Sequence, residues 1–209
     1  LHHDESLHAF YSWNLYDGNG FQHNPMMHGP LQFEANTAIF FAFGDTDYTA
    51  RLLYALVGTA MVGLPFFFRG RLGRLGALFV AVMLAFSPAM LYFSRFARGD
   101  ILMATWTLGI VICMWRYMDE GRNRYLYVAA ALLALLFATK ETAYLAVGVL
   151  GLYLVLLLVW RTVAGALSGV ELSAVAPSVA LQRVGGSLAA LVRRDVRLAD
   201  VSRAGAFLV

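Results

Sequence analysis

Charged residues and cysteine are the scarce components of this sequence of 209 residues. Asp, Glu, Lys and Arg together make up 14% of it, whereas a soluble domain has about a quarter. So low a share argues against a soluble globular domain. The single cysteine, Cys113, excludes an intrachain disulfide. The net charge of +3 is no sign of nucleic-acid binding, because the basic residues are spread over loops between hydrophobic stretches.

Long hydrophobic runs occupy most of the chain. Hydrophobic residues account for 60% of the sequence, and the mean hydropathy is +0.64. A helix that crosses a bilayer needs roughly 20 apolar residues. Five stretches come close to that length: 49–68, 74–94, 101–118, 125–139 and 143–160. The sequence therefore predicts an all-α, polytopic membrane protein with about five transmembrane helices.

The distribution of arginine predicts how these helices are oriented. Basic residues gather in alternate connecting segments, namely 69–74, 116–124 and the part after 161. Such segments are retained on the cytoplasmic side of a membrane. By alternation, three segments are expected outside: 1–48, 95–100 and 140–142. We therefore expect a multi-pass protein of the plasma membrane whose functional face is extracytoplasmic.

Three regions follow from this orientation. Residues 1–48 form an extracytoplasmic loop, in which the apolar stretch 31–43 predicts an interfacial helix lying on the outer leaflet. Residues 49–160 form the five-helix transmembrane region. Residues 161–209 predict either a cytoplasmic amphipathic segment leading to a further span or a flexible connector. The chain starts without Met and ends in apolar residues, so we interpret it as a fragment of a larger protein.

An acidic pair near the start of the chain, Asp4-Glu5, is the first candidate for chemistry. A carboxylate at the outer end of a helix can serve as general base toward a hydroxyl, although such pairs are also common as solvated loop acids. Nearby histidines, among them His3 and His28, allow a divalent metal as a secondary interpretation. Their spacing matches no strong zinc motif, so no metal site or cofactor is expected.

The other candidates lie in two short outer segments. Arg95 and Arg98 are three residues apart, which places both guanidinium groups on one face if the helix continues. Arginine binds phosphate oxygens in a forked manner, and headgroup snorkelling is the alternative. Asp100 is expected to pair with one of them. In the turn at 139–142, Lys140 is suited to bind a phosphate and Glu141 to orient it or a sugar, or the two form an interfacial ion pair.

In this arrangement the chain resembles the amino-terminal half of the GT-C membrane glycosyltransferases, in the branch of protein O-mannosyltransferases and aminoarabinose transferases. Four elements carry the resemblance: Asp4-Glu5, His28-Gly29-Pro30-Leu31, Ala50-Arg51-Leu52, and Arg95, Arg98 and Asp100. The second element departs from the His-Pro-Pro-Leu pattern of that branch, because Gly29 stands in the place of the first proline.

Three further matches point to the prokaryotic flippase-activity-associated proteins of archaeal N-glycosylation, the group that the chain resembles most. They are His3-Asp4-Glu5, Phe93-Ser94-Arg95 and Thr139-Lys140-Glu141. The resemblance covers about residues 2–160. The segment after 160 carries none of these elements.

The resemblance implies an inverting transferase that uses a polyprenyl-phosphate sugar. Asp4 and Glu5 would be the catalytic residues, with Asp4 deprotonating the acceptor hydroxyl. The donor phosphate would be held by Arg95, Arg98 and Lys140. The sugar or acceptor pocket would be lined by His3, His28, Asp100 and Glu141. The implied partners are the lipid-linked donor, membrane lipids and a protein or glycan acceptor.

A non-catalytic function stays open beside this one. The chain would then be an accessory protein that binds lipid-linked glycans during their translocation. A carboxylate at position 4 discriminates between the two, because a transferase needs a base there whereas a binder tolerates Asn. A transporter fits less well, because transporters place their ionisable groups mid-membrane in broken helices.

Overall fold

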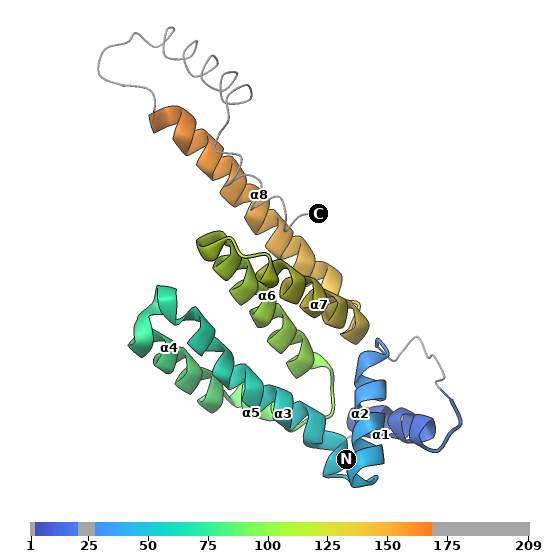
Figure 1. Ribbon diagram of the computed structural model, residues 1–209. Helices are drawn as coiled ribbons and strands as arrows, with labels where there is room; N and C mark the ends of the chain where they lie inside the picture. Colours follow the sequence, from blue (N-terminus) through green and yellow to red (C-terminus); the bar gives the residue numbers. More distant parts are fainter. Residues whose placement is uncertain (1–2, 21–27, 169–209) are drawn as a thin grey trace, which may run out of the picture. The chain divides into compact units, whose positions relative to one another are not determined.

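Helices form all the regular structure in the part of the chain that the computed structural model describes, residues 3–20 and 28–168 (Figure 1). This confirms the predicted all-α class. In chain order they are α1 (His3–Tyr16), α2 (Leu31–Phe43), α3 (Thr49–Gly63), the 3₁₀ helix η1 (Leu64–Phe68), α4 (Arg69–Phe86), α5 (Pro88–Ser94), α6 (Asp100–Glu120), α7 (Arg124–Thr139) and α8 (Ala143–Ser168).

The chain divides into two units. One comprises Leu1–Arg116 and Arg122–Tyr144, and the other comprises Tyr117–Gly121 and Leu145–Val209. The first unit contains every residue predicted for the functional site. The described part of the second is mostly α8, whose side chains are largely apolar and exposed. The predicted cytoplasmic segment 161–209 lies outside the described residues from 169 onward.

Three described helical runs are long and apolar enough to cross a membrane: Thr49–Phe86, Asp100–Glu120 and Ala143–Val163. They confirm the membrane character of the chain. The first run contains the predicted span 49–68 and most of the predicted span 74–94. The predicted span 125–139 corresponds to the apolar helix Arg124–Thr139, which is shorter than a full span.

The run from 49 to 86 reverses direction at a glycine. Gly73 has φ 73° and ψ 170°, values outside the helical region, so α4 is broken there. A positive φ is readily adopted by glycine and rarely by other residues. After the break α4 packs against η1 and α3, beside which it lies in Figure 1. The segment 69–74, predicted as a loop, is therefore helical apart from Gly73, and the chain reverses its direction within it.

The hydrophobic core joins α3 to α6 through the segment between α5 and α6. Its buried members are Tyr54, Met61, Ala97, Ile101 and Leu102. Gly58 allows α3 to approach α5 closely, because a Cβ atom on Gly58 would lie 2.5 Å from the Cβ atom of Ser94. Small residues serve this purpose between packed membrane helices.

Helix α2 coincides with the predicted helix 31–43. It ends at Gly44, whose φ of 84° lets its N–H group donate to the carbonyl of Phe40. The face against its neighbours α1 and α3 is partly polar and buries Gln32, Asn36 and Thr37. Its outward aromatic side chains are exposed, Phe41 at 69%. The location of α2 on an outer leaflet stays a prediction.

The charged side chains of the first unit gather at opposite ends of the same helices. Arg51 lies in the first turn of α3, Asp100 begins α6 and Lys140 follows the last residue of α7. The arginines Arg69 and Arg124 lie at the other ends, after η1 and at the start of α7. With 1.5 Å per residue, α7 alone separates the two groups by roughly 24 Å.

Candidate functional site

Glu5 anchors the amino-terminal helix to two other parts of the first unit. Its side chain is 2% exposed. Arg51 donates to both carboxylate oxygens, from Nε at 2.9 Å and from Nη2 at 2.7 Å. The backbone N–H of Ala97 donates to Oε1 at 3.0 Å. Because both oxygens are engaged in this forked pair, Glu5 ties α1 to α3 and to the segment before α6.

Asp4, the neighbour of Glu5, belongs to a chain of alternating charges. Nη1 of Arg98 lies 3.3 Å from Oδ2 of Asp4, and Nε of Arg98 lies 3.4 Å from Oδ2 of Asp100. The other oxygen of Asp100 accepts a hydrogen bond from Nζ of Lys140 at 2.9 Å. We call Asp4, Arg98, Asp100 and Lys140 the ionic chain. Three segments that are distant in sequence meet in it.

Exposure differs along the ionic chain. The Asp4 side chain is 48% exposed, and those of Arg98 and Asp100 are 31% and 28% exposed. The Lys140 side chain is only 13% exposed. A largely buried ammonium group needs a close anion, and Asp100 supplies it. Asp4 is therefore the member most accessible to an incoming molecule.

Arg95 is not part of the ionic chain. Helix α5 ends at Ser94 and α6 begins at Asp100, so no continuing helix brings Arg95 and Arg98 onto one face, and that expectation was wrong. Arg95 is exposed, and its side chain forms no ion pair with any residue that the structure describes. Its guanidinium group remains available to an anion from outside.

Two histidines adjoin the ionic chain. Nδ1 of His28 lies 3.2 Å from Oε2 of Glu141, whose side chain is 66% exposed. A hydrogen bond from its own backbone and another from His28 lower the pKa of Glu141 below its usual value. The ring of His28 stacks on that of His8 at 6.4 Å between centroids.

His8 is held neutral by its surroundings. The residue is 6% exposed, and burial, followed by the nearby His28 and Arg98, lowers its pKa from 6.5 to about 4. Gln32 donates from Nε2 to Nδ1 of His8 at 2.9 Å, which leaves the proton of the neutral ring on Nε2. The Oε1 atom of Gln32 is buried without a hydrogen-bond partner among the described residues. His8 and Gln32 thus place a neutral polar pair beside the charges.

Gly29 shows why the His-Pro-Pro-Leu pattern is altered here. Its backbone N–H donates to the carbonyl of Thr139 at 3.1 Å, a bond that proline cannot form because it lacks the N–H group. A Cβ atom at position 29 would also overlap the carbonyl of Ala138. The glycine therefore brings His28 close to the turn that carries Lys140 and Glu141.

His3 stays apart from these contacts. It is the exposed first residue of α1, and its carbonyl accepts a hydrogen bond from Ser6. Over residues 3–20 and 28–168, no group of three His, Cys, Asp or Glu side chains is arranged to hold a metal ion.

Three residues of the site were not among the predicted site residues: Arg51, His8 and Gln32. Arg51 had a sequence signal, since an arginine that opens an apolar span must find an anion or reach water. No signal in the sequence marks His8 and Gln32, because a histidine in α1 and a glutamine in α2 become partners only when the two helices pack.

The site is close to electrically balanced as it stands. Its acidic side chains are Asp4, Glu5, Asp100 and Glu141, and its basic ones are Arg51, Arg95, Arg98 and Lys140. A guanidinium group has five N–H donors and an ammonium group three, so Arg98 and Lys140 can bind further oxygens without leaving Asp100. Asp100 thereby holds two cations on either side of one carboxylate, an arrangement suited to a phosphate group.

A known protein family matches the region that contains most of the site residues. The family described as dolichyl-phosphate-mannose-protein mannosyltransferase matches residues 27–180, well over half of the chain. Arg98, Asp100 and Lys140 lie within the matched region, and Asp4 and Glu5 lie before it. No curated protein and no solved structure matches the chain.

Proposed function

Since this chain belongs to the dolichyl-phosphate-mannose-protein mannosyltransferase family, which consists of membrane glycosyltransferases, we propose that it transfers a sugar from a polyprenyl-phosphate donor to an acceptor hydroxyl. Transfer takes place on the extracytoplasmic face and inverts the anomeric carbon. The observation that carries the proposal is the ionic chain, in which the half-exposed carboxylate of Asp4 pairs with Arg98, and Arg98 shares Asp100 with Lys140.

Asp4 acts as the general base of the reaction. The proton of the acceptor hydroxyl passes to an oxygen of Asp4 while the hydroxyl oxygen forms a bond to the anomeric carbon. The bond between that carbon and the phosphate oxygen breaks, and its electron pair leaves with the polyprenyl phosphate. The exposure of Asp4 supports this assignment, because a base must reach the proton that it removes.

Arg98 and Lys140 bind the phosphate and offset the charge that develops as it leaves. Their shared partner Asp100 is a positioning residue, which keeps both donors oriented before the substrate arrives. Arg95 adds a third cation from the exposed side of the same segment. A phosphate near the hydrocarbon region needs such partners, because an isolated ion there is costly.

Glu5 supports the base without touching the substrate. Its forked pair with Arg51 holds the first turn of α1 in place, and Asp4 is the adjacent residue. Glu141 and His28 form a more exposed pair at the edge of the ionic chain, where a sugar or acceptor hydroxyl is to be recognised. The acceptor is a protein or a glycan.

The test is the variant Asp4→Asn in the protein in its native membrane. Transfer from a labelled polyprenyl-phosphate sugar should fall by about a hundredfold or more, which is what a general base contributes. Donor binding should be retained, because Arg98 and Lys140 are unchanged. The variant Glu34→Gln removes an exposed carboxylate of α2 outside the site, and serves as the matched control at equal expression.

The outcomes separate the alternatives. Unchanged transfer by Asp4→Asn contradicts the role of Asp4 as base. If the unaltered protein transfers no sugar and yet retains lipid-linked glycan, the accessory function is supported instead. Lys140→Gln should weaken donor binding while Glu34→Gln leaves it unaltered, and equal effects of the two contradict the assignment of Lys140 to the phosphate.

A further inference from the structure

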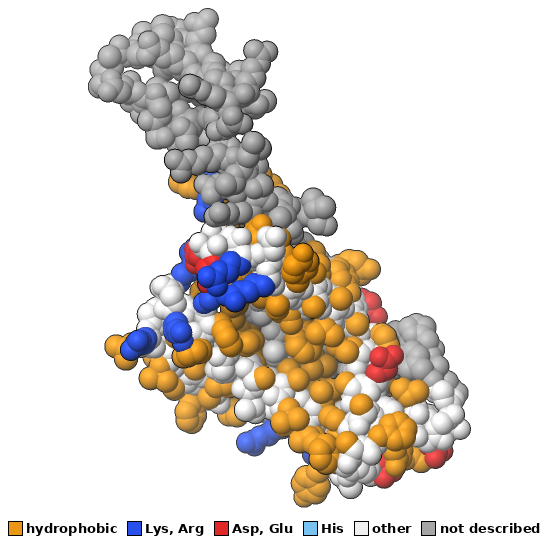
Figure 2. All heavy atoms as spheres, viewed as in Figure 1, with side chains coloured by type: hydrophobic (Ala, Val, Ile, Leu, Met, Phe, Trp, Pro, Cys, Tyr) orange, Lys and Arg blue, Asp and Glu red, His pale blue; other side chains and the backbone are white. Residues whose placement is uncertain are grey.

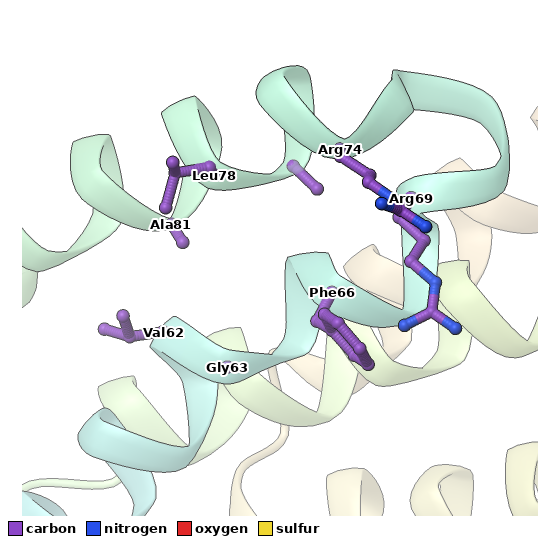
Figure 3. A pocket seen from close by; sticks show the side chains of 8 residues that line it. Val62, Gly63, Phe66, Arg69, Arg74, Leu78 and Ala81 are labelled. Atoms are coloured by element: carbon purple, nitrogen blue, oxygen red, sulfur yellow. The ribbon is translucent and has the colours of Figure 1, made fainter.

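An apolar cavity lies between the end of α3, η1 and α4, near the end of the helices remote from the ionic chain (Figure 3). Its volume is about 530 Å³, within the range of cavities that bind small ligands. Val62, Leu78 and Ala81 line its apolar part, and Phe66 lies at its other end, towards the arginines.

Two arginines stand at the end of this cavity opposite Val62. Figure 3 shows the side chains of Arg69 and Arg74 next to each other there. The guanidinium group of Arg69 lies over the ring of Phe66, 4.1 Å from its centroid. Both arginines are exposed, and neither forms an ion pair within residues 3–20 and 28–168. The turn at Gly73 sets the two side by side.

The outer surface of α4 next to the cavity is hydrophobic. Its large apolar side chains are exposed, among them Leu75 at 82%, Phe79 at 64% and Phe86 at 74%. In Figure 2, most of the basic side chains on the visible face gather toward one end, and hydrophobic side chains cover much of the rest. Helix α4 belongs to a run apolar enough to cross a membrane, so this surface contacts lipid chains.

We propose that this cavity binds one anionic phospholipid. The lipid phosphate lies between Arg69 and Arg74, and one acyl chain lies along Val62, Leu78 and Ala81. The charges are complementary, because the arginines carry two positive charges that no described carboxylate neutralises. The apolar walls continue from the arginines toward the lipid-facing surface, so one molecule with an anionic head and an apolar tail fills both parts.

Other occupants match the cavity less well. Free phosphate satisfies the arginines but leaves the apolar walls without a partner. A zwitterionic phospholipid carries its own cation next to its phosphate, so it gains less from two guanidinium groups. The lipid site is independent of sugar transfer, because α3, η1 and α4 line it, whereas the ionic chain is formed by α1, the start of α6 and the turn after α7.

The experiment uses the protein reconstituted in vesicles of phosphatidylglycerol and phosphatidylcholine in equal amounts. Native mass spectrometry then counts the lipids that stay bound after detergent extraction. One phosphatidylglycerol should be retained per chain, and Arg69→Gln/Arg74→Gln should weaken its binding roughly thirtyfold, as expected for two basic residues near a membrane surface. Ala81→Phe fills the cavity without changing the charge and should also abolish retention.

Arg161→Gln is the control, because it removes an exposed arginine of α8 that does not line the cavity. It should leave retention unchanged. An equal loss in this variant means that overall charge attracts the lipid, and it overturns the proposal. Normal retention in Ala81→Phe also overturns it, since the acyl chain then lies elsewhere. Displacement of the lipid by millimolar inorganic phosphate would show that the arginines bind a free anion and not a lipid.

Discussion

The forked pair between Glu5 and Arg51 allows a quantitative prediction about the stability of the site. Breaking a buried ion pair costs about 3–5 kcal/mol, whereas an exposed pair is worth about 0–1 kcal/mol. Here the Glu5 side chain is 2% exposed and that of Arg51 is 40% exposed. We therefore expect Glu5→Gln to lower the free energy of unfolding by about 2–3 kcal/mol, because Arg51 regains water and the amide oxygen still accepts from Ala97.

Replacing Arg51 should destabilise the protein more than replacing Glu5. Arg51→Gln removes the guanidinium group that donates to both oxygens of an almost fully buried carboxylate. Its cost should approach about 4 kcal/mol, within the range for removing one partner of a buried ion pair. The double variant Glu5→Gln/Arg51→Gln should be less destabilised than the sum, with a coupling energy of about 2 kcal/mol.

The assay is a denaturant titration of the four proteins in detergent micelles at pH 7, followed by circular dichroism. Glu141→Gln is the control, because its pair with His28 is exposed and should contribute less than about 1 kcal/mol. A coupling energy below about 0.5 kcal/mol would refute the reasoning. So would an Arg51→Gln variant as stable as Glu5→Gln, because the difference in exposure then has no energetic consequence.

Two further predictions concern His8 and Gly29. His8 binds a proton in the unfolded chain below about pH 6.5 but in the folded protein only near pH 4, so its contribution to stability is complete above pH 6.5 and declines by roughly 3 kcal/mol as the pH falls to 4. His8→Asn, whose side-chain oxygen can accept from Gln32, should flatten the stability profile measured from pH 4 to 7, and an unchanged slope would contradict this. Gly29→Ala should destabilise the protein by about 1–3 kcal/mol, because its Cβ would meet the carbonyl of Ala138. In thermal unfolding, Gly148→Ala is the comparison for a glycine with open space around it and no positive φ, and equal effects would show that the contact is irrelevant.

The helices were largely predictable because hydrophobicity along a chain is a local property. The apolar stretch 31–43 is α2 with the same bounds, and the stretch 143–160 lies within α8. The arginine-rich segment 69–74 was predicted as a loop, and the chain does reverse there, although only Gly73 leaves the helical conformation. The predicted span 74–94 ends at Ser94, where α5 also ends.

The sequence predicted which residues belong to the candidate site better than it predicted the contacts between them. Asp4, Arg98, Asp100 and Lys140 were selected from the sequence, and the structure brings them together. Arg95, chosen by the same reasoning, stays outside the ionic chain because its helix ends one residue before it. The engagement of Glu5 by Arg51 was not foreseen, since it depends on how α1 packs near α3.

The sequence by itself determined that this is an α-helical membrane protein and where its charges are concentrated, because burial in lipid restricts the backbone to helices and confines ionisable groups to their ends. Only the tertiary structure decided which charges meet. Glu5 and Arg51 are 46 residues apart, Asp4 and Arg98 are 94 apart, and Asp100 and Lys140 are 40 apart. Pairing over such distances depends on the packing of whole helices, and no local pattern of residues encodes it.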